Sequence, residues 1–350
     1  MSVAPFPHNN LTKRKVVFLS RLFTPHIGGV ETHVSRLSFE LQKRGYEITV
    51  ITEQHDSLLP LSEYLNGVHI YRISHALLGH KLTIWFWMFT HVELFLKADL
   101  VHAHDVFWWY LPLRMFFPTK PAFTTFHGYE GAGDPTKKAV RSRKISERLS
   151  RKTICVGDWM KLWYGASPDT VIYGAASVQP STTIKSPSAV FIGRLSEDTG
   201  VLVYVDAVLK MRGKVTLDIY GEGALLPKVL SRIRNSPYIR YTGVTHVPET
   251  IYKKYRFAFV SRYLGMIEAM QCGRQVFAHW NNSIKFDYLQ SFPAIEDAFV
   301  FSGPGELIKQ LQQTLDSPER ANQRVKHAQV WALKQTWQKI ADTYEELWTK

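Results

Sequence analysis

Cysteine is scarce in this chain, and acidic residues and long apolar runs are scarce too. Only two of the 350 residues are cysteine, Cys155 and Cys272, and each stands in an apolar context. Two isolated thiols do not build a disulfide framework, and neither has a Cys or His neighbour at the spacing of a zinc site. The sequence therefore predicts a cytoplasmic protein of a reducing compartment, held together by its core.

The most apolar window, residues 82–92, is too short to cross a bilayer. It lies between Lys81 and Glu93, whereas a membrane-spanning helix needs about 20 apolar residues. No apolar stretch precedes Val16, so we expect no signal peptide. Two interpretations of residues 82–92 stay open: a helix packed in the N-terminal core, or a helix whose aromatic side chains dip into a membrane surface.

Acidic residues are outnumbered by basic ones, 30 Asp and Glu against 43 Lys and Arg, which gives a net charge of +13. Residues 137–152 hold eight Lys or Arg and one acid, Glu147, with apolar residues among them. This pattern is typical of a helix with a basic face, which suits solvent, an anionic membrane surface or nucleic acid. Because no nucleic-acid recognition motif is present, we expect no nucleic-acid partner.

What the chain does contain is a strand–loop–helix–strand unit near its N-terminus. Residues 16–20 and 47–52 are short apolar runs suited to buried parallel strands, and apolar residues recur at helical spacing between them. Gly28 and Gly29 stand at the strand-to-helix turn, where backbone N–H groups and the helix N-terminus favour negative charge. The unit predicts a ligand that carries phosphate; the alternative is a turn that needs glycine only for its geometry.

Apolar strands and helical patterns alternate along the rest of the chain, on either side of a linker-like segment at residues 175–188. The strand candidates are residues 100–103, 122–126, 153–156 and 170–172 before it, and 189–193, 215–220, 239–243, 257–260 and 275–278 after it. The alternation predicts an α/β protein with two doubly wound parallel sheets. Ligands of such sheets bind beyond the carboxyl ends of the strands, so two such domains facing each other across a cleft would suit a two-substrate enzyme.

The last part of the chain, residues 318–348, has helical periodicity, and we expect one long helix there. The residues on its apolar side are Val330, Leu333, Trp337, Ile340, Tyr344 and Leu347.

Short motifs also follow one another in a recognisable order. They are residues 25–33, 44–52, 99–104, 125–128, 191–195, 220–223, 241–243 and 267–273. With these motifs the chain resembles glycosyltransferase family 4, whose members are retaining enzymes of the GT-B fold that use nucleotide sugars. The resemblance implies an N-terminal acceptor-side Rossmann-like domain at 1–176 and a C-terminal donor-binding domain at 186–330. It also implies that residues 331–350 form a helix that crosses back to the first domain.

The resemblance assigns roles to individual residues. Glu268 matches the glutamate that hydrogen-bonds the ribose hydroxyls, and Arg194 matches the basic residue that neutralises the diphosphate. His127 matches a histidine near the transferred sugar, and together with Arg194 it is expected to be catalytic. The expected donor-binding residues are Gly28, Gly29, Gly193, Arg194, Gly221, Tyr263, Leu264 and Glu268, and the expected acceptor or sugar contacts are Glu31, His104 and Arg262.

Structural alternatives stay open beside these roles. Glu268 could be a polar residue at a helix edge, Arg194 a surface ion-pair partner and His127 a satisfied core histidine. His102, His104 and Asp105 are close together in sequence, and on one strand His102 and His104 would share a face, but these two have no third ligand of clear spacing, so we expect no metal.

The chain departs from the family pattern at three points. The first of the two usual glutamates falls at Val260, the lysine that follows the Gly-Arg pair is replaced by Thr199, and Tyr173 stands where the interdomain segment usually has asparagine. The glutamate normally contacts the donor sugar, and the lysine is one of two basic contacts to the diphosphate. We expect Arg262, Tyr263 or Lys285 to supply the lost contacts.

The sequence therefore predicts a metal-independent, retaining glycosyltransferase with no cofactor beyond its nucleotide-sugar co-substrate. The donor is expected to be linked to UDP or GDP, and the acceptor to be a glycan or a lipid-linked molecule of cell-envelope polysaccharide or glycolipid synthesis. The basic and aromatic segments favour a peripheral location at the inner face of the cell membrane. The alternative function is a non-catalytic relative that binds a nucleotide sugar or glycan beside another transferase.

Overall fold

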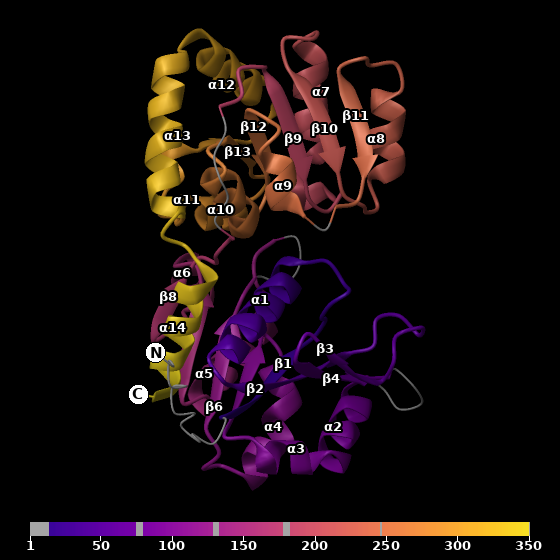
Figure 1. Ribbon diagram of the computed structural model, residues 1–350, viewed down its shortest axis with the longest axis vertical. Coiled ribbons are helices and arrows are strands. Elements are labelled where there is room, and N and C mark those ends of the chain that lie inside the picture. The colour runs from indigo at the N-terminus through magenta and orange to yellow at the C-terminus, as the bar shows by residue number, and fades with distance from the viewer. Residues whose placement is uncertain (1–13, 75–79, 129–132, 178–182, 246, 350) are drawn as a thin grey trace, which may run out of the picture. The chain divides into compact units, whose positions relative to one another are not determined.

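The structure, a computed structural model, describes residues 14–74, 80–128, 133–177, 183–245 and 247–349 (Figure 1). Contacts divide the chain into two compact units, one running up to Thr125 with Arg148–Lys152, the other formed by Phe126–Glu147 and the chain from Thr153 onward. Within the described residues, no helix is both long enough and apolar enough to cross a membrane. The predicted domain ranges, 1–176 with 331–350 and 186–330, stay predictions.

The first sheet has eight strands in the order β3-β4-β2-β1-β5-β6-β7-β8. Their bounds are β1 Lys15–Ser20, β2 Glu47–Glu53, β3 Ser62–Leu65, β4 Val68–Ile73, β5 Leu100–His104, β6 Ala122–Phe126, β7 Lys152–Val156 and β8 Thr170–Ile172. Strand β1 pairs in parallel with β2 and β5, and only the β3–β4 pair is antiparallel among the pairings described. All of β1 beyond Lys15 is buried, as its short apolar run predicts.

Six helices follow strands of this sheet. They are α1 Gly29–Lys43, α2 His80–Thr90, α3 Val92–Lys97, α4 Phe107–Phe116, α5 Lys137–Leu149 and α6 Trp159–Tyr164. In α1, Val34, Leu37 and Leu41 are buried at helical spacing, which confirms the amphipathic pattern. The sequence predicted a helix with a basic face in α5, and most of its basic residues are exposed, but Arg143 is buried, with its guanidinium 3.9 Å from the centre of the Tyr164 ring. The aromatic face holds this one cation by a cation–π contact.

Residues 82–92 are packed in the core along one stripe only, and the membrane-surface interpretation stays a prediction. Ile84 and Met88 of α2 are buried in the core, while Leu82, Phe86 and Phe89 of the same helix are exposed. One stripe of the helix therefore packs against the unit, and an equally apolar stripe faces outward.

The second sheet has six strands in the order β11-β10-β9-β12-β13-β14, and every pair is parallel. Their bounds are β9 Ser188–Ile192, β10 Thr216–Tyr220, β11 Ile239–Gly243, β12 Phe257–Val260, β13 Gln275–His279 and β14 Phe299–Phe301. The prediction of two doubly wound parallel sheets is confirmed, apart from the antiparallel strand β3 at the edge of the first sheet.

The helices of this part are α7 Val201–Lys210, α8 Leu226–Ile233, α9 Pro248–Tyr252, α10 Tyr263–Gln271, α11 Ser283–Gln290, α12 Pro304–Asp316, α13 Pro318–Ala332 and α14 Trp337–Thr349. Tyr204 of α7 is fully buried and stacks on Phe259 with ring centres 4.5 Å apart. Its hydroxyl lies 2.9 Å from the carbonyl oxygens of both Val260 and Phe277. This hydroxyl fixes the ends of β12 and β13, next to which the predicted donor residues stand.

The prediction of one helix over residues 318–348 is wrong. Helix α13 ends at Ala332, α14 begins at Trp337, and Leu333, predicted to lie on a continuous apolar side, is exposed. The side-chain amide of Gln271 in α10 lies 3.0 Å from the carbonyl oxygens of Ala332 and Gln335, so it satisfies the end of α13. The hydroxyl of Thr336 accepts the N–H of Lys339 and starts the next helix.

Candidate functional site

Most of the predicted donor-binding residues follow adjacent strands of the second sheet. Gly193 and Arg194 come directly after β9, Gly221 follows β10, and Glu268 lies in α10, which follows β12. Strand β9 pairs with both β10 and β12 in parallel. The carboxyl ends of parallel strands meet at one edge of a sheet, so these residues share the edge where such folds bind ligands.

Gly221 is required by close packing of two backbones. Its φ is +137°, and a Cβ on it would lie 1.9 Å from the carbonyl oxygen of Gly193. The two loops are also joined by the N–H of Leu195, which donates to the carbonyl of Glu222 at 2.7 Å. Gly193 itself has ordinary room for a Cβ, 3.5 Å from Phe191. Of the two predicted glycines, Gly221 therefore fixes the shape of this edge.

Three basic side chains converge on one carboxylate at this edge, a group we name the Asp198 cluster: Arg194, Asp198, Arg262 and Lys285. The carboxylate Oδ2 of Asp198 accepts from Arg262 Nη2 at 2.7 Å and lies 3.6 Å from Arg194 Nη2. Burial acts to raise the pKa of Asp198, but the Ser196 hydroxyl and the three nearby cations outweigh it and lower that pKa. The cluster thus holds more positive than negative charge.

Lys285 is the buried member of the Asp198 cluster. Its side chain is fully buried, its ammonium donates to the carbonyl of Ser261, and it lies 4.9 Å from the centre of the Tyr288 ring. Burial, together with the charges of Arg262 and Arg194, lowers the pKa of Lys285 well below its usual value, against an opposing effect of Asp198. Lys285 therefore holds the backbone at Ser261, next to Arg262. The two arginines are more accessible: 37% of the Arg262 side chain and 68% of the Arg194 side chain are exposed.

Tyr263 and Leu264 occupy the first turn of α10. Tyr263 is buried, its ring stacks on Tyr288 with centres 3.9 Å apart, and its N–H donates to the Tyr288 hydroxyl at 2.7 Å. The ring of Tyr263 thus belongs to the core beneath the strand ends, whereas Leu264 is half-buried. Sequence reasoning did not point to Asp198 or Tyr288, because neither belongs to a motif.

Glu268 is half-buried one and a half turns into α10. Its charge acts on the nearby phenol of Tyr252. Burial, and to a smaller extent the charge of Glu268, raise the pKa of Tyr252 well above its usual value. It is also close to Cys272, whose pKa burial raises to about 11. The carboxylate is therefore placed on the half-exposed side of α10, next to groups that stay neutral.

At the first sheet, Gly28 and Glu31 lie at the start of α1. Gly28 has an extended φ of −172°, and a Cβ on it would lie 2.1 Å from the Glu31 carboxylate. That carboxylate is held 2.9 Å from Nδ1 of His26. Gly29 has open space around its Cα. The predicted phosphate turn therefore has a carboxylate beside its first glycine, which suits a hydroxyl-bearing ligand better than bare phosphate.

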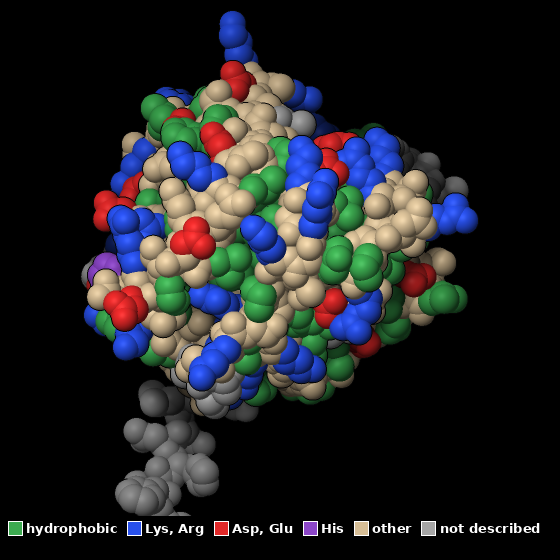
Figure 2. Space-filling view, turned by 90° about the horizontal axis from the view of Figure 1, so that it is seen from above, with side chains coloured by type: hydrophobic (Ala, Val, Ile, Leu, Met, Phe, Trp, Pro, Cys, Tyr) green, Lys and Arg blue, Asp and Glu red, His purple; other side chains and the backbone are tan. Residues whose placement is uncertain are grey.

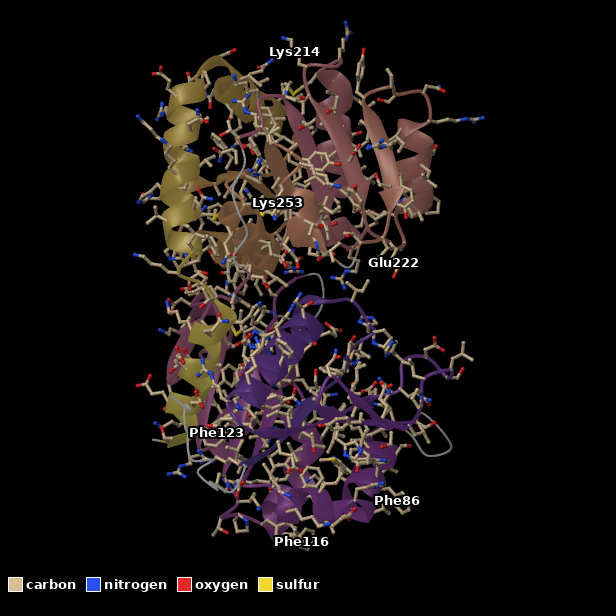
Figure 3. The ribbon with its side chains drawn as sticks, viewed as in Figure 1. Phe86, Phe116, Phe123, Lys214, Glu222 and Lys253 are labelled. Carbon is tan, nitrogen blue, oxygen red and sulfur yellow. The ribbon has the colours of Figure 1, made fainter. Side chains whose placement is uncertain are left out.

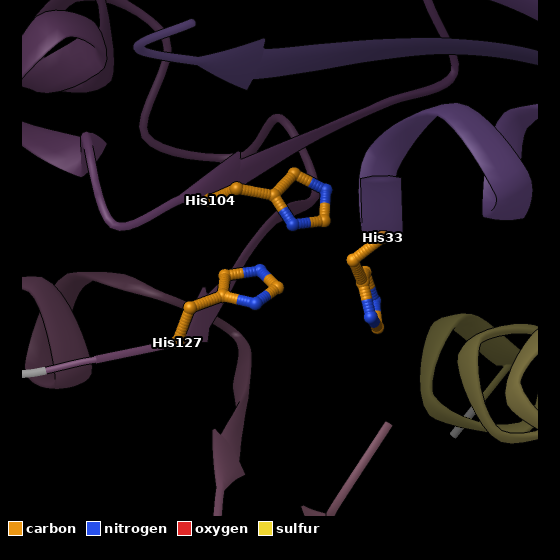
Figure 4. A group of neighbouring side chains, drawn as sticks. All are labelled: His33, His104 and His127. Carbon is orange, nitrogen blue, oxygen red and sulfur yellow. The ribbon is translucent and has the colours of Figure 1, made fainter. Parts of the chain in front are cut away.

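Three histidines meet near the carboxyl ends of β5 and β6 (Figure 4). His33 comes from α1, His104 ends β5 and His127 follows β6, and a ligand nitrogen of each lies within 4.8 Å of the others. The sequence pointed instead to His102 with His104, but His102 turns to Thr125, whose Oγ1 lies 2.8 Å from its Nε2. His33 was missed, since its only signal was its place in the first motif.

Burial and the charge of Arg143 lower the pKa of His127 to about 3. His127 is therefore neutral at pH 7 and offers one N–H and one lone pair to a hydroxyl. Neutral imidazoles are also metal ligands, but the Arg143 guanidinium, which donates to the carbonyl of Gly128 at 2.6 Å, makes this place unfavourable for a cation. The histidine group is thus better suited to sugar hydroxyls than to a metal.

Residues 27–169 match the profile of Glycosyltransferase Family 4. This part of the chain is therefore similar to that family. It is 34% identical over 98 residues to an uncharacterized glycosyltransferase of Methanocaldococcus jannaschii. That match covers 26% of this chain and spans about a quarter of the relative, 25% of its length.

Solved structures share the fold over nearly the whole chain. Sucrose-phosphate synthase from Thermosynechococcus elongatus is 16% identical with a TM-score of 0.79, covering 96% of this chain and 98% of its own. Anabaena HepE in complex with UDP and glucose is 15% identical with a TM-score of 0.76, covering 96% and 99%. The chain therefore has the GT-B fold, with two parallel-sheet Rossmann-like domains.

At two positions where family 4 usually has a charged residue, this chain has a buried, uncharged residue instead. Val260 ends β12 with 1% of its surface exposed, and Thr199 is 2% exposed with its hydroxyl donating to the carbonyl of Ser196 at 2.7 Å. A charged side chain in either place would have to leave the core. Of the residues named from the sequence as replacements, Arg262 keeps an exposed guanidinium at this edge, whereas Lys285 is buried and has a lowered pKa.

His127→Gln is expected to flatten the dependence of stability on pH between about pH 6.5 and pH 3. Because the pKa of His127 is lowered from 6.5 to about 3 in the fold, only the unfolded chain takes up this proton as the pH falls through that window. The group therefore removes up to about 1.4 kcal/mol of stability per pH unit on acidification. Urea unfolding midpoints at several pH values measure the slope.

The control for this prediction is His69→Gln, on the edge hairpin of β3 and β4. It should keep the wild-type slope. An unchanged slope in His127→Gln would show that His127 titrates normally and is not held neutral by its surroundings.

Proposed function

We propose that this protein is a retaining, metal-independent glycosyltransferase that moves a sugar from a UDP- or GDP-linked donor to a glycan or lipid-linked acceptor. The observation that carries the proposal is the Asp198 cluster, which gathers two exposed guanidinium groups, Arg194 and Arg262, around one carboxylate at the carboxyl ends of β9 and β12. A nucleoside diphosphate needs such charge, because its departure from the sugar builds negative charge on the leaving oxygen.

Each member of the site has a role in this proposal. Arg194 and Arg262, which keep exposed guanidinium groups, bind the diphosphate oxygens and stabilise them in the transition state. Lys285 holds the Ser261 carbonyl and so positions the start of α10. Glu268 accepts hydrogen bonds from the ribose hydroxyls. No residue is assigned as an enzymic nucleophile; the acceptor attacks from the face that the diphosphate leaves, which retains the anomeric configuration.

The acceptor is proposed to be a glycan or a lipid-linked saccharide of cell-envelope synthesis. The histidine group His33, His104 and His127, of which His127 is neutral at pH 7, and the carboxylate of Glu31 are assigned to hydroxyls of the acceptor or the transferred sugar. Support for a uridine donor comes from neighbours: Anabaena HepE is described in complex with UDP-glucose, and Staphylococcus aureus TarM in complex with UDP and alpha-GlcNAc-glycerol.

A second candidate function is a non-catalytic relative that binds a nucleotide sugar or glycan beside another transferase. The buried Val260 and Thr199 favour it, since a family contact to the donor sugar and one to the diphosphate are missing. The two candidates differ in whether donor hydrolysis or transfer accompanies binding.

Binding of one nucleotide is expected to raise the melting temperature by a few degrees, and Glu268→Ala is expected to abolish that rise. A ligand at 100 times its Kd adds about 2.7 kcal/mol to the stability of the folded state. The measurement is a thermal-shift screen of UDP, GDP, ADP and their common sugar conjugates, run in EDTA and in parallel with Mg²⁺, so that a metal requirement would be detected. Glu319→Ala, at an exposed position of α13, is the matched control and should respond as wild type does.

The outcome decides between the candidates. A shift that Glu268→Ala removes supports the donor site and names the base, and sugar release from the same conjugate then separates the enzyme from the binding relative. A shift that needs a divalent cation contradicts metal independence. No shift with any nucleotide contradicts the donor site itself.

A further inference from the structure

Helix α2 is apolar on a side that the fold leaves uncovered. Leu82, Phe86 and Phe89 follow one another at i, i+4 and i+7 and are 58%, 63% and 43% exposed. The buried stripe, Ile84 and Met88, lies on a different side of the same helix. A helix that is apolar around most of its circumference is normally enclosed by protein or lipid.

Neighbouring helices extend this surface. Leu96 of α3 is 52% exposed, and Met115 and Phe116 at the end of α4 are 71% and 69% exposed. The rings of Phe89 and Phe116 meet edge to face with centres 5.8 Å apart, so α2 and α4 form one surface. Figure 3 shows Phe86 and Phe116 at the same outer edge of the first unit, whereas Phe123 of β6 lies inside. We name Leu82, Phe86, Phe89, Leu96, Met115 and Phe116 the outer apolar face.

Basic side chains border the outer apolar face. Neither α2 nor α4 carries an acidic residue in its sequence, while Lys81, Lys97 and Arg114 are in or next to these helices and α3. Lys120 stands beside Leu96, with its ammonium donating to the Ala98 carbonyl at 2.6 Å. Glu93 is the acid of α3. Exposed apolar side chains with a basic border complement an anionic lipid surface.

Two tryptophans belong to the helices of the outer apolar face, Trp85 to α2 and Trp108 to α4. Trp85 and Trp108 are half-buried, and the Trp85 indole N–H donates to the Trp108 carbonyl at 3.0 Å. Lys81 lies 5.6 Å from the centre of the Trp108 ring. Tryptophan beside lysine is typical of the depth at which lipid headgroups meet acyl chains.

We propose that the outer apolar face docks the protein on an anionic lipid bilayer. The eleven residues of α2 are too few to span it, so the helix lies in the interface with its phenylalanines among the acyl chains and its lysines at the headgroups. This surface is separate from the donor site, so the proposal goes beyond the proposed function and is tested without sugar transfer.

The test is sedimentation of the full chain with vesicles of phosphatidylcholine alone or with about a quarter phosphatidylglycerol, at low salt. Wild type is expected to bind the anionic vesicles and not the neutral ones. Phe86→Ser with Phe116→Ser should weaken that binding about tenfold or more, since each ring adds buried apolar area. The matched control, Leu162→Ser with Val330→Ser, changes two residues that are 71% and 58% exposed on α6 and α13 and should bind as wild type.

A second variant, Leu82→Ser with Leu96→Ser, repeats the test with aliphatic side chains in case the first fails to fold. Basic side chains are also spread over the face seen in Figure 2, so charge alone could attract lipid elsewhere. Equal binding by wild type and both face variants would therefore overturn the proposal. So would no binding to either vesicle, or a dimer in solution that the face variants dissociate, since the face would then join two copies.

Discussion

Arg194→Ala is expected to lower the kcat of sugar transfer about 10²- to 10³-fold, with a much smaller effect on KM. The reason is that Arg194 is the most exposed cation of the Asp198 cluster, with 68% of its side chain accessible to a ligand. Its charge is needed most when the diphosphate leaves and carries more negative charge than in the bound donor. Initial rates of transfer, or of donor hydrolysis where the acceptor is unknown, measure the loss.

The matched control is Arg232→Ala. Arg232 of α8 also forms an exposed ion pair with an aspartate, Asp206 of α7, but away from the strand ends. Its removal should leave kcat within about twofold of wild type, because surface ion pairs contribute little. A loss of similar size in both variants would point to general destabilisation. An unchanged kcat in Arg194→Ala would remove Arg194 from the mechanism and leave Arg262 as the cation to test.

Gly221→Ala is expected to destabilise the protein by more than about 3 kcal/mol, which corresponds to a fall of over 100-fold in the folding equilibrium. Two costs act together at this position. The backbone has a φ of +137°, which an L-residue adopts with strain, and the new Cβ would lie 1.9 Å from the Gly193 carbonyl oxygen. The main chain at Gly193 or Gly221 would have to move, because the oxygen of Gly193 belongs to the backbone and cannot turn aside as the end of a flexible side chain can.

Two further alanine substitutions separate these costs. Gly243→Ala has a φ of +95° but open space around it, so it should show only the conformational cost, about 1 kcal/mol. Gly303→Ala has an extended φ of −149° and open space, so it should be nearly neutral. Denaturant unfolding ranks the three variants. Equal destabilisation at Gly221 and Gly243 would show that the close approach to Gly193 relaxes at little cost.

Much of this architecture could be predicted from the sequence. The short apolar runs from Val16 to Ser20 and from Phe257 to Val260 are buried strands, because burial on both faces demands an almost continuous apolar sequence. The order of motifs led to family 4, and the residues named for the donor site follow adjacent strands. That Arg262 or Lys285 replaces the lost contacts stays a prediction.

Other features depended on contacts between distant residues. Helical periodicity continued through Leu333, but the helix ends because Gln271, far away in the sequence, reaches the carbonyls of Ala332 and Gln335. Tyr263 was expected to contact the donor because it follows the position of the lost glutamate, yet its ring stacks on Tyr288 and is buried in the core. The local sequence around Ala332 and around Tyr263 carries no information on these distant partners, Gln271 and Tyr288.

The sequence by itself determined the strands, the amphipathic helices and the resemblance to family 4, since these follow from local periodicity and motif order. Only the tertiary structure decided that Asp198 collects two arginines, that His33 joins His104 and His127, and that one stripe of α2 stays uncovered. Charge, hydrogen bonding and burial act through space. A side chain's role is therefore set by the elements that the fold packs around it, whichever residues precede it in the chain.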